Sequence, residues 1–342
     1  MPSTSLPHRP WVRDDTPLLW RDDQTVEAGD GPRRVIIDRV DNAVVSWAMS
    51  LRGERTLDEA LDAAEQSGVR RSAALRLLRA LRPTGALDDA SVVAESLRGA
   101  TPDLRLRLAP GMASSRIVHG SAEIAAQCVD RRLAAVVAIH GDSDVAEAIA
   151  AALSQAGIGG IVREERLSSS SRRARRASRQ RTCHILCDVP HADAASDPDA
   201  VALDVPHLAV CVRGAHATVG PFVLPGLTGC LRCGDLHRSD RDPAWPRMAV
   251  QLQHRRPAVP PVDPALAAMA AGLTALQVLA WIDSGDHEGA LRWPRGWPQD
   301  APPTVSARLV IALPGGHVTR TPAPPHPLCG CRWLAARGSV SA

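Results

Sequence analysis

Four cysteines arranged as two close pairs constrain this chain more than any other feature. Cys230 and Cys233 are separated by two residues, and Cys329 and Cys331 by one residue. Two tight pairs of thiols are the ligand pattern of a tetrahedral structural zinc site, because a single turn of chain directs both sulfurs of a pair at the same ion. The sequence therefore predicts Zn²⁺ bound by all four cysteines, joining the last residues to the middle of the fold as a structural metal.

Two other uses of these cysteines are disfavoured by the sequence. Disulfide-bonded or ordinary thiols are the first alternative, but disulfide frameworks are typical of short secreted chains. This chain has 342 residues, and residues 1–15 show no apolar signal segment. A redox C-x-x-C motif is the second alternative, and such a motif opens a helix after a strand. Here Pro225 and Gly226 predict a turn before the first pair, and the second pair would have no role.

The charged side chains limit both the partners and the chemistry. The sequence has 40 basic and 37 acidic residues, a formal net charge of +3, so composition alone favours neither nucleic acid nor a membrane surface. All of the basic residues counted there are arginines, because the sequence contains no lysine. A mechanism that needs a lysine is therefore excluded for this chain alone.

One long uncharged run has to be distinguished from a membrane span. Ala265 to Ile282 carries no charged side chain, but Gly272, Thr274 and Gln277 interrupt it. A span needs about 20 predominantly apolar residues. We therefore expect a buried helix in the core of a soluble, cytoplasmic protein that has no membrane partner.

The first ninety residues predict a small α+β module. Short runs of β-branched and apolar residues between turn residues predict three strands, at 18–20, 25–28 and 35–38. Apolar residues at helical spacing predict three helices, at 42–51, 56–68 and 72–81. The second of these helices begins with a capping box formed by Thr56 and Glu59. A small sheet with three helices is a winged-helix-like arrangement, assigned here to residues 1–90.

This module resembles the RiPP recognition element, the small domain that captures the leader segment of a peptide precursor by adding it as a strand. The resemblance covers roughly residues 17 to 90. It rests on the order of the elements and on the pattern Asp-x-x-Asp … Leu-x-Gly-x-x-Thr-x-x-Glu from Asp38 to Glu59. An edge strand can pair with an extended peptide through main-chain hydrogen bonds. The residues that the resemblance implies for this role are Val35, Ile36, Ile37 and Asp38.

Two other roles for the module stay open. It can serve as a docking or dimerisation domain. A DNA-reading role is the other possibility, because arginines decorate the third helix: Arg70, Arg71, Arg76, Arg79 and Arg82. The preceding helix carries acidic side chains that favour an ion-paired, solvated face instead: Glu54, Asp58, Glu59, Asp62 and Glu65. Nucleic acid is therefore the disfavoured partner.

The C-terminal part predicts a Rossmann-like α/β domain over residues 131–342. The apolar run 133–139 is typical of a strand covered on both faces, and it is followed by a loop, an alanine-rich helix to Gln155 and a second strand ending near 162. Further strands are predicted at 184–187 and 207–212. The Ser- and Arg-rich stretch 163–181 predicts an exposed loop, and the sequence does not assign a role to it. Residues 91–130 predict a connector with a break at Pro102 and a helix at 121–129.

The order of parts from residue 131 to 335 resembles that of ThiF-type adenylyltransferases, the superfamily of ubiquitin-activating enzymes. A β-α-β start, an apolar strand leading into C-x-x-C, a crossing loop, a long apolar helix and a closing cysteine pair follow one another. The stretch Val219-Gly-Pro … Pro225-Gly-x-x-x-Cys-x-x-Cys continues as Asp235-Leu-His-Arg-x-Asp-Arg-Asp-Pro-x-Trp245-Pro. It is most similar to bacterial members that accompany YcaO-type cyclodehydratases, which often carry a recognition element in front.

The resemblance also implies where ATP and Mg²⁺ would bind. Family enzymes use a Gly-x-Gly-x-x-Gly loop, an acid after the second strand, an Arg and a Lys near the phosphates, and an Asp that holds magnesium. By position these correspond to Gly141 for the loop, Glu164 or Glu165 for the acid, and Asp188 for the magnesium ligand in a catalytic role. Only one glycine of the loop is kept, and the lysine is missing, for which arginine is a poor replacement.

Acidic residues occupy the predicted phosphate position. Asp142 and Asp144 lie at the start of a helix, where backbone amides ordinarily attract an anion. Asp144 and Glu147 have the spacing of a capping box, so the helix is predicted to cap itself with its own carboxylates. An incoming triphosphate would meet like charge. The sequence therefore predicts that the scaffold and its zinc are retained while ATP binding and adenylation are lost.

These observations predict a zinc-stabilised ThiF-like protein that binds a peptide or small protein, such as a precursor leader, for a partner modifying enzyme such as a YcaO-type cyclodehydratase. An active ATP-dependent adenylyltransferase that activates a carboxyl terminus is the main alternative, and a DNA-binding regulator is a weaker one. A nicotinamide dehydrogenase is disfavoured because the glycine fingerprint is absent. The resemblance alone implies a homodimer.

Overall fold

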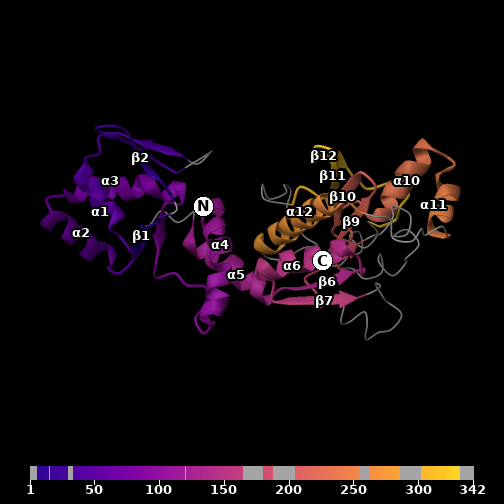
Figure 1. Ribbon diagram of the computed structural model, residues 1–342, viewed down its shortest axis with the longest axis horizontal. Helices are drawn as coiled ribbons and strands as arrows, with labels where there is room; N and C mark the ends of the chain where they lie inside the picture. Colours follow the sequence, from indigo (N-terminus) through magenta and orange to yellow (C-terminus); the bar gives the residue numbers. More distant parts are fainter. Residues whose placement is uncertain are drawn as a thin grey trace, which may run out of the picture. The chain divides into compact units, whose positions relative to one another are not determined.

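The computed structural model describes residues 6–14, 16–29, 34–119, 121–164, 180–187, 205–254, 262–285 and 302–331 of the chain. The chain divides into two compact units, Met1–Asp130 and Arg131–Ala342. Each unit has its own cluster of buried apolar side chains. Figure 1 shows the elements of both units along the chain.

The N-terminal unit contains a three-stranded antiparallel sheet in the order β2-β3-β4, formed by β2 (Leu18–Asp22), β3 (Thr25–Ala28) and β4 (Val35–Ile37). Three helices follow it, namely α1 (Asn42–Met49), α2 (Leu57–Gln66) and α3 (Arg71–Leu81). The predicted capping box is confirmed, because the Thr56 hydroxyl accepts from the Glu59 amide and the Glu59 carboxylate accepts from the Thr56 amide. These three strands and three helices were therefore predictable from pattern and capping residues.

A second, two-stranded sheet in this unit was not predicted. Strand β1 (Pro10–Val12) pairs antiparallel with β5 (Leu87–Asp89). The Asp89 carboxylate stabilises the pairing by accepting from the backbone amides of His8 at 2.6 Å and Arg9 at 3.1 Å. Strands of three residues carry too little alternation to be recognised in a sequence. The single-turn helices η2 (Arg82–Thr84) and η3 (Glu95–Leu97) flank β5.

The predicted connector is mostly helical. Helix α4 (Pro102–His119) begins at the proline expected to break the chain, and α5 (Ala122–Ala134) follows it. Proline is well suited to the first turn of a helix, where its missing N–H would have no partner in any case. Pro102 therefore starts a helix instead of interrupting one.

The C-terminal unit is built on a seven-stranded mixed sheet in the order β12-β11-β10-β9-β8-β6-β7. Four neighbouring strands are parallel: β6 (Val136–His140), β7 (Gly160–Glu164), β8 (Cys183–Cys187) and β9 (His207–Arg213). Three more strands continue the sheet in antiparallel fashion: β10 (His216–Val223), β11 (Ala307–Ala312) and β12 (His317–Pro322). This mixed α/β sheet confirms the Rossmann-like architecture.

Helices complete this unit. Helix α6 (Asp144–Gln155) connects β6 to β7, while α10 (Leu231–Arg241) and α11 (Trp245–His254) follow β10. Helix α12 (Pro264–Asp283) is long and apolar enough to cross a membrane. It nevertheless packs against α6, β9 and β10, and 56% of its most apolar stretch is buried. The Gln277 side chain accepts from the Thr304 amide at 3.2 Å. The prediction of a buried core helix therefore agrees with the packing of α12.

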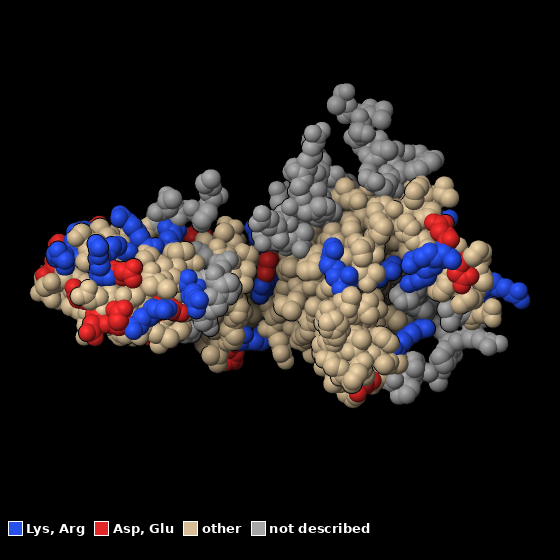
Figure 2. Space-filling model, turned by 90° about the horizontal axis from the view of Figure 1, so that it is seen from above, with Lys and Arg blue, Asp and Glu red and all other residues tan. Residues whose placement is uncertain are grey.

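Two sequence predictions lie outside the described residues. Asp188 is one of them, and most of the Ser- and Arg-rich stretch 163–181 is the other, since only 163, 164, 180 and 181 are described. On the face shown in Figure 2, acidic and basic side chains are interspersed over the N-terminal unit.

Candidate functional site

The four cysteines come from two segments that the sheet brings together. Strand β10 ends in a turn in which the Thr228 hydroxyl accepts from the Leu224 amide at 2.8 Å. The chain then reaches Cys230, which precedes the first residue of α10, and Cys233 in the first turn of that helix. Strand β12 pairs with β11, which pairs with β10, so the chain leaving β12 passes the start of α10. Cys329 and Cys331 lie on that returning segment.

The sulfur atoms of the four cysteines form one cluster. The Sγ–Sγ distances are 3.7 Å for Cys230–Cys233, 3.4 Å for Cys230–Cys329 and 3.5 Å for Cys233–Cys331. All four sulfurs lie within 4.8 Å of one another. Four thiolates arranged tetrahedrally at the usual zinc–sulfur distance of about 2.3 Å would be about 3.8 Å apart. A disulfide requires about 2.05 Å. The cluster is therefore open enough for a metal ion and too wide for disulfides.

Burial and the hydrogen bonds between neighbouring sulfurs give Cys230, Cys233 and Cys331 different pKa values. The hydrogen bond with Cys233, together with burial, raises the pKa of Cys230 well above its ordinary value, and burial raises that of Cys331 to about 12. The hydrogen bond from Cys230 lowers the pKa of Cys233 to about 4. Several thiolates at this spacing repel one another, and a divalent cation between them removes that repulsion.

One sequence argument about this site was wrong. The first pair was expected not to open a helix, but α10 begins directly after Cys230. Pro225 and Gly226 form their turn earlier, so the local structure alone does not exclude a redox motif. The second pair favours a metal site over a redox motif, since Cys329 and Cys331 complete the sulfur cluster from a distant segment. A metal site uses all four sulfurs, whereas a redox pair uses two.

The carboxyl ends of the parallel strands form the edge where a Rossmann-like fold binds a nucleotide. Here β6 leads through Gly141, which has a φ of 116°, into α6. The helix cap is Ser143, whose hydroxyl accepts from the Ala146 amide at 3.4 Å, and not Asp144 as predicted. The cap was predicted one residue too late, because serine and aspartate are both good caps, and Ser143 has alanine at the third helix position, so the predicted capping box does not form. Asp144 and Glu147 both lie in the first turn of α6.

An arginine from the neighbouring strand closes over this loop. The Arg163 guanidinium donates to the Gly141 carbonyl oxygen at 3.1 Å and forms an ion pair with Glu147 at 3.2 Å. Gly141 and Glu147 are therefore joined to β7 through one side chain. The helix terminus presents carboxylates in its first turn, and Arg163 is already engaged by Gly141 and Glu147.

Glu164, the predicted acidic residue after the second strand, is the last residue of β7. Its carboxylate lies 3.9 Å from the Arg181 guanidinium and 3.6 Å from Nδ1 of His140. His140 is buried and its Nε2 lies 2.7 Å from Nδ1 of the buried His184. Sequence reasoning missed this histidine pair, since 44 positions separate the two residues and only the β6–β8 pairing brings them together.

The predicted peptide-binding strand lies at the edge of its sheet. Strand β4 pairs with β3 on one side, and no described strand pairs with its other side. Ile36 is 50% exposed, while Ile37 is buried. Asp38 is exposed and follows the strand instead of belonging to it. Arg76 of α3 donates to the Arg39 carbonyl oxygen at 2.5 Å, so α3 fixes the chain directly after β4.

Comparisons with known proteins place the fold. No family model matches the chain, and no curated protein matches it in sequence. Among solved structures, E. coli MccB with succinimide matches with a TM-score of 0.62 at 13% identity, over 94% of this chain and 99% of MccB. The microcin C7 biosynthetic enzyme MccB in complex with N-formylated MccA matches with a TM-score of 0.63 at 13% identity over the same shares.

The chain shares the fold of MccB. The heterocyclase TruD also matches, with a TM-score of 0.63 at 17% identity over 94% of this chain, which spans 42% of the length of TruD. The resemblance predicted from the sequence is confirmed at the level of fold. At sequence identities this low, the structural match shows the fold alone. Activity, substrate and partners have to be argued from the site.

Proposed function

We propose that this chain is a zinc-stabilised, ThiF-like protein that binds the leader of a precursor peptide and presents it to a modifying enzyme such as a YcaO-type cyclodehydratase. Residues 1–90 act as a winged-helix-like recognition element, residues 91–130 as a connector and residues 131–342 as the scaffold. Support comes from the fold shared with MccB, which has been solved with MccA and its derivatives.

The observation that carries this proposal is the outer edge of β4, with which none of the described strands pairs. An edge strand presents a row of backbone donors and acceptors that an extended peptide can satisfy by adding another strand. The neighbouring helix α3 packs against β4, so a peptide on this edge would also meet α3. Ile36 offers an exposed apolar side chain beside that edge, which a peptide side chain can cover.

The sheet supplies a matched pair of substitutions for a test. Leu19 of β2, Glu27 of β3 and Ile36 of β4 are directly opposite one another in register, so their side chains share one face of the sheet. Leu19 is 58% exposed and lies on the opposite edge strand. Ile36→Asp and Leu19→Asp therefore introduce the same charge at two exposed sites on opposite edges of the sheet.

We expect Ile36→Asp to weaken leader binding at least tenfold, and Leu19→Asp to change it less than twofold. The measurement is the fluorescence anisotropy of a labelled candidate leader peptide titrated with each protein. Circular dichroism controls for the fold of both variants. Wild-type affinity in Ile36→Asp would contradict binding at β4, and equal losses in the two variants would point to the whole sheet face.

Loss of adenylation is the second part of the proposal. The amino end of α6 carries Asp144 and Glu147 where phosphates would approach, and Arg163 is engaged by Gly141 and Glu147. A triphosphate would have to displace that ion pair and face the remaining carboxylate. We expect calorimetry to detect no saturable heat with Mg²⁺ and ATP, and no exchange of labelled pyrophosphate into ATP.

The active adenylyltransferase is the competing function, and one observation favours it. Glu164 stands at the end of β7, in the position of the family acid, with Arg181 nearby. Peptide-dependent pyrophosphate exchange above the level of a Glu164→Gln control would establish it. In both of these functions the zinc ion bound by Cys230, Cys233, Cys329 and Cys331 has a structural role. The proposal also includes a homodimer, and light scattering of the purified protein tests it.

A further inference from the structure

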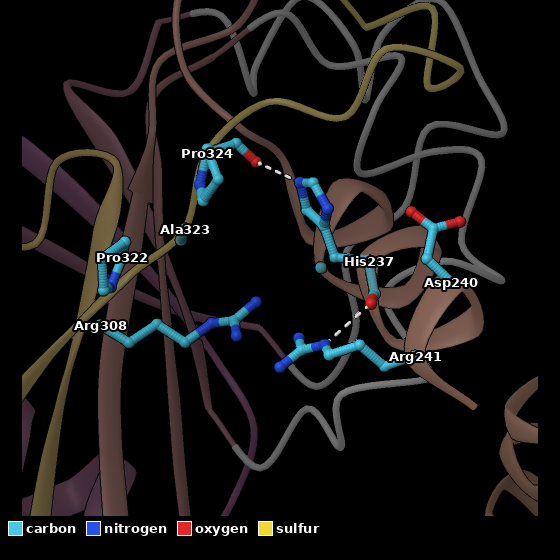
Figure 3. Close-up of a pocket in the computed structure, with 8 residues that line it drawn as sticks. His237, Asp240, Arg241, Arg308, Pro322, Ala323 and Pro324 are labelled. Atoms are coloured by element: carbon cyan, nitrogen blue, oxygen red, sulfur yellow. Dashed lines mark hydrogen bonds between the residues drawn. The ribbon is translucent and has the colours of Figure 1, made fainter.

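A cavity of about 310 Å³ opens beside the cysteine cluster of the C-terminal unit. One wall is helix α10, and the other is the end of β12 with the chain that follows it (Figure 3). The lining residues are Gly234, His237, Asp240, Arg241, Arg308, Pro322, Ala323 and Pro324. Gly234 directly follows Cys233, and Pro324 precedes Cys329 by a few residues, so the cysteine cluster joins the two walls.

Two guanidinium groups point toward each other across this cavity. Figure 3 shows Arg308 extending from β11 and Arg241 extending from α10. Arg241 uses Nε to donate to the His237 carbonyl oxygen at 3.0 Å, which leaves its terminal nitrogens directed at the cavity. The Arg308 guanidinium lies over Gly234, where a Cβ atom would be 2.2 Å from its Nη2. Glycine therefore provides the room that Arg308 occupies.

Arg308 is the unusual member of this pair. Its Nε is buried and has no hydrogen-bond partner, and no ion pair joins Arg308 to another described residue. The nearby Asp235 pairs with Arg238 at 3.0 Å through Oδ1, and its charge also acts on Arg308, although no ion pair joins the two residues. Burial and the neighbouring Arg238 lower the pKa of Arg308. A buried Nε–H without a partner loses hydration that no protein group replaces, and the rest of the guanidinium faces the cavity.

We propose that this cavity binds a ligand through a carboxylate or phosphate group held between Arg308 and Arg241. Guanidinium groups bind both oxyanions through paired N–H···O bonds, and an anion between two of them replaces their mutual repulsion with attraction. The one carboxylate in the lining, Asp240, points away from the two guanidiniums and bonds to His326 at 2.8 Å. Pro322, Ala323 and Pro324 offer an apolar surface to the rest of the ligand.

The topology separates this site from the nucleotide-binding edge. Strand β10 runs antiparallel to β9, and Pro322 at the end of β12 pairs with Ala307 at the start of β11. The end of β12 therefore lies toward the edge of the sheet that holds the amino ends of the parallel strands. The β6–α6 loop lies at the opposite edge. A ligand in the cavity is thus a separate ligand from a nucleotide bound there.

The test is isothermal titration calorimetry of the purified full chain, with inorganic phosphate as the ligand in one arm and succinate in the other. Sodium chloride keeps the ionic strength the same in both arms. We expect saturable binding of at least one anion, and the arm that saturates identifies the ligand chemistry. Arg308→Met keeps the aliphatic stem and should weaken that binding at least tenfold. Arg241→Met, at a more exposed position, should weaken it to a similar extent.

Arg213→Met is the matched control, because Arg213 is exposed and ends β9 at the opposite edge of the sheet. It should leave anion binding within twofold of the wild type. Binding of neither anion above the chloride baseline would overturn the proposal. Wild-type affinity in both Arg308→Met and Arg241→Met would overturn it as well. Leader binding at β4 should be unchanged in all three variants, so this outcome is independent of the proposed function.

Discussion

At the scale of single residues, the cysteines show which parts of a site can be predicted. The spacing within each pair is a local property, so the sequence alone singled out the four cysteines whose sulfurs the structure brings together. Arg308 and Arg241 carry no such signal, since one lies on β11 and the other on α10, and only the pairing of β10 with β11 brings them together. The same holds for His140 and His184. Sequence reasoning therefore missed the side chains that only strand pairing brings together. It found the cysteines because their spacing is visible in the sequence.

Removing the second cysteine pair should remove the metal. Cys329→Ser with Cys331→Ser leaves two ligands, so zinc content measured by mass spectrometry should fall from one ion per chain to below a tenth. Cys230 and Cys329 are 99 positions apart, and a cross-link closing a loop of about 100 residues contributes roughly 4 to 5 kcal/mol by chain entropy. We expect a loss of about 3 to 5 kcal/mol in unfolding free energy in denaturant titration.

Cys211→Ser serves as the control for that prediction. Cys211 lies on β9, is partly buried and belongs to no group of potential metal ligands among the described residues. This variant should keep its zinc. Full zinc content in the double variant would instead show that the metal binds elsewhere in the chain.

At the scale of elements, most helices and strands followed from pattern, and the exceptions have physical reasons. Helix α2 was set by its capping box, and α12 by a long apolar run that needs a buried partner. Strands β1 and β5 are too short to show a period. Helix α6 begins one residue earlier than predicted because Ser143 caps it. The error at α6 arose because two neighbouring residues, Ser143 and Asp144, are both suitable helix caps. The sequence alone does not tell which of them caps the helix.

The approach of the segment after β12 to the start of α10 gives a prediction for Gly229. A Cβ atom at this position would lie 2.5 Å from the Ala323 carbonyl oxygen and 2.7 Å from that of Pro324. Backbone atoms cannot rotate away, so Gly229→Ala should push the two segments apart and destabilise the unit by about 1 to 3 kcal/mol. Thermal unfolding followed by circular dichroism measures this change.

Gly315→Ala is the comparison for Gly229→Ala, since nothing lies within 4 Å of a Cβ atom at that position in the β11–β12 turn. We expect a change of less than about 0.5 kcal/mol there, as for ordinary surface substitutions. Equal effects of the two substitutions would show that the close approach at Gly229 does not hold in solution.

At the scale of the whole molecule, function is divided between two units with separate cores. The apolar cluster of the N-terminal unit contains residues from Val12 to Leu87, and the larger cluster of the C-terminal unit contains residues from Ala135 to Ile311. The proposed peptide edge belongs to the first unit. The cysteine cluster and the arginine cavity belong to the second. Each proposed binding activity therefore depends on one unit.

Separate expression of the two units tests this division. Helix α5 runs through the boundary, so the fragments are best cut to 1–134 and 131–342, which gives each fragment the last turn of that helix. We expect fragment 131–342 to bind one zinc ion and unfold cooperatively, because its core and all four cysteines are present. Fragment 1–134 should bind the leader within about threefold of the full chain, an energy difference of roughly 0.7 kcal/mol. Ile36→Asp should abolish that binding in the fragment as well. Leader binding by fragment 131–342, or by the full chain alone, would show that the peptide contacts the scaffold and that β4 is at most part of its site.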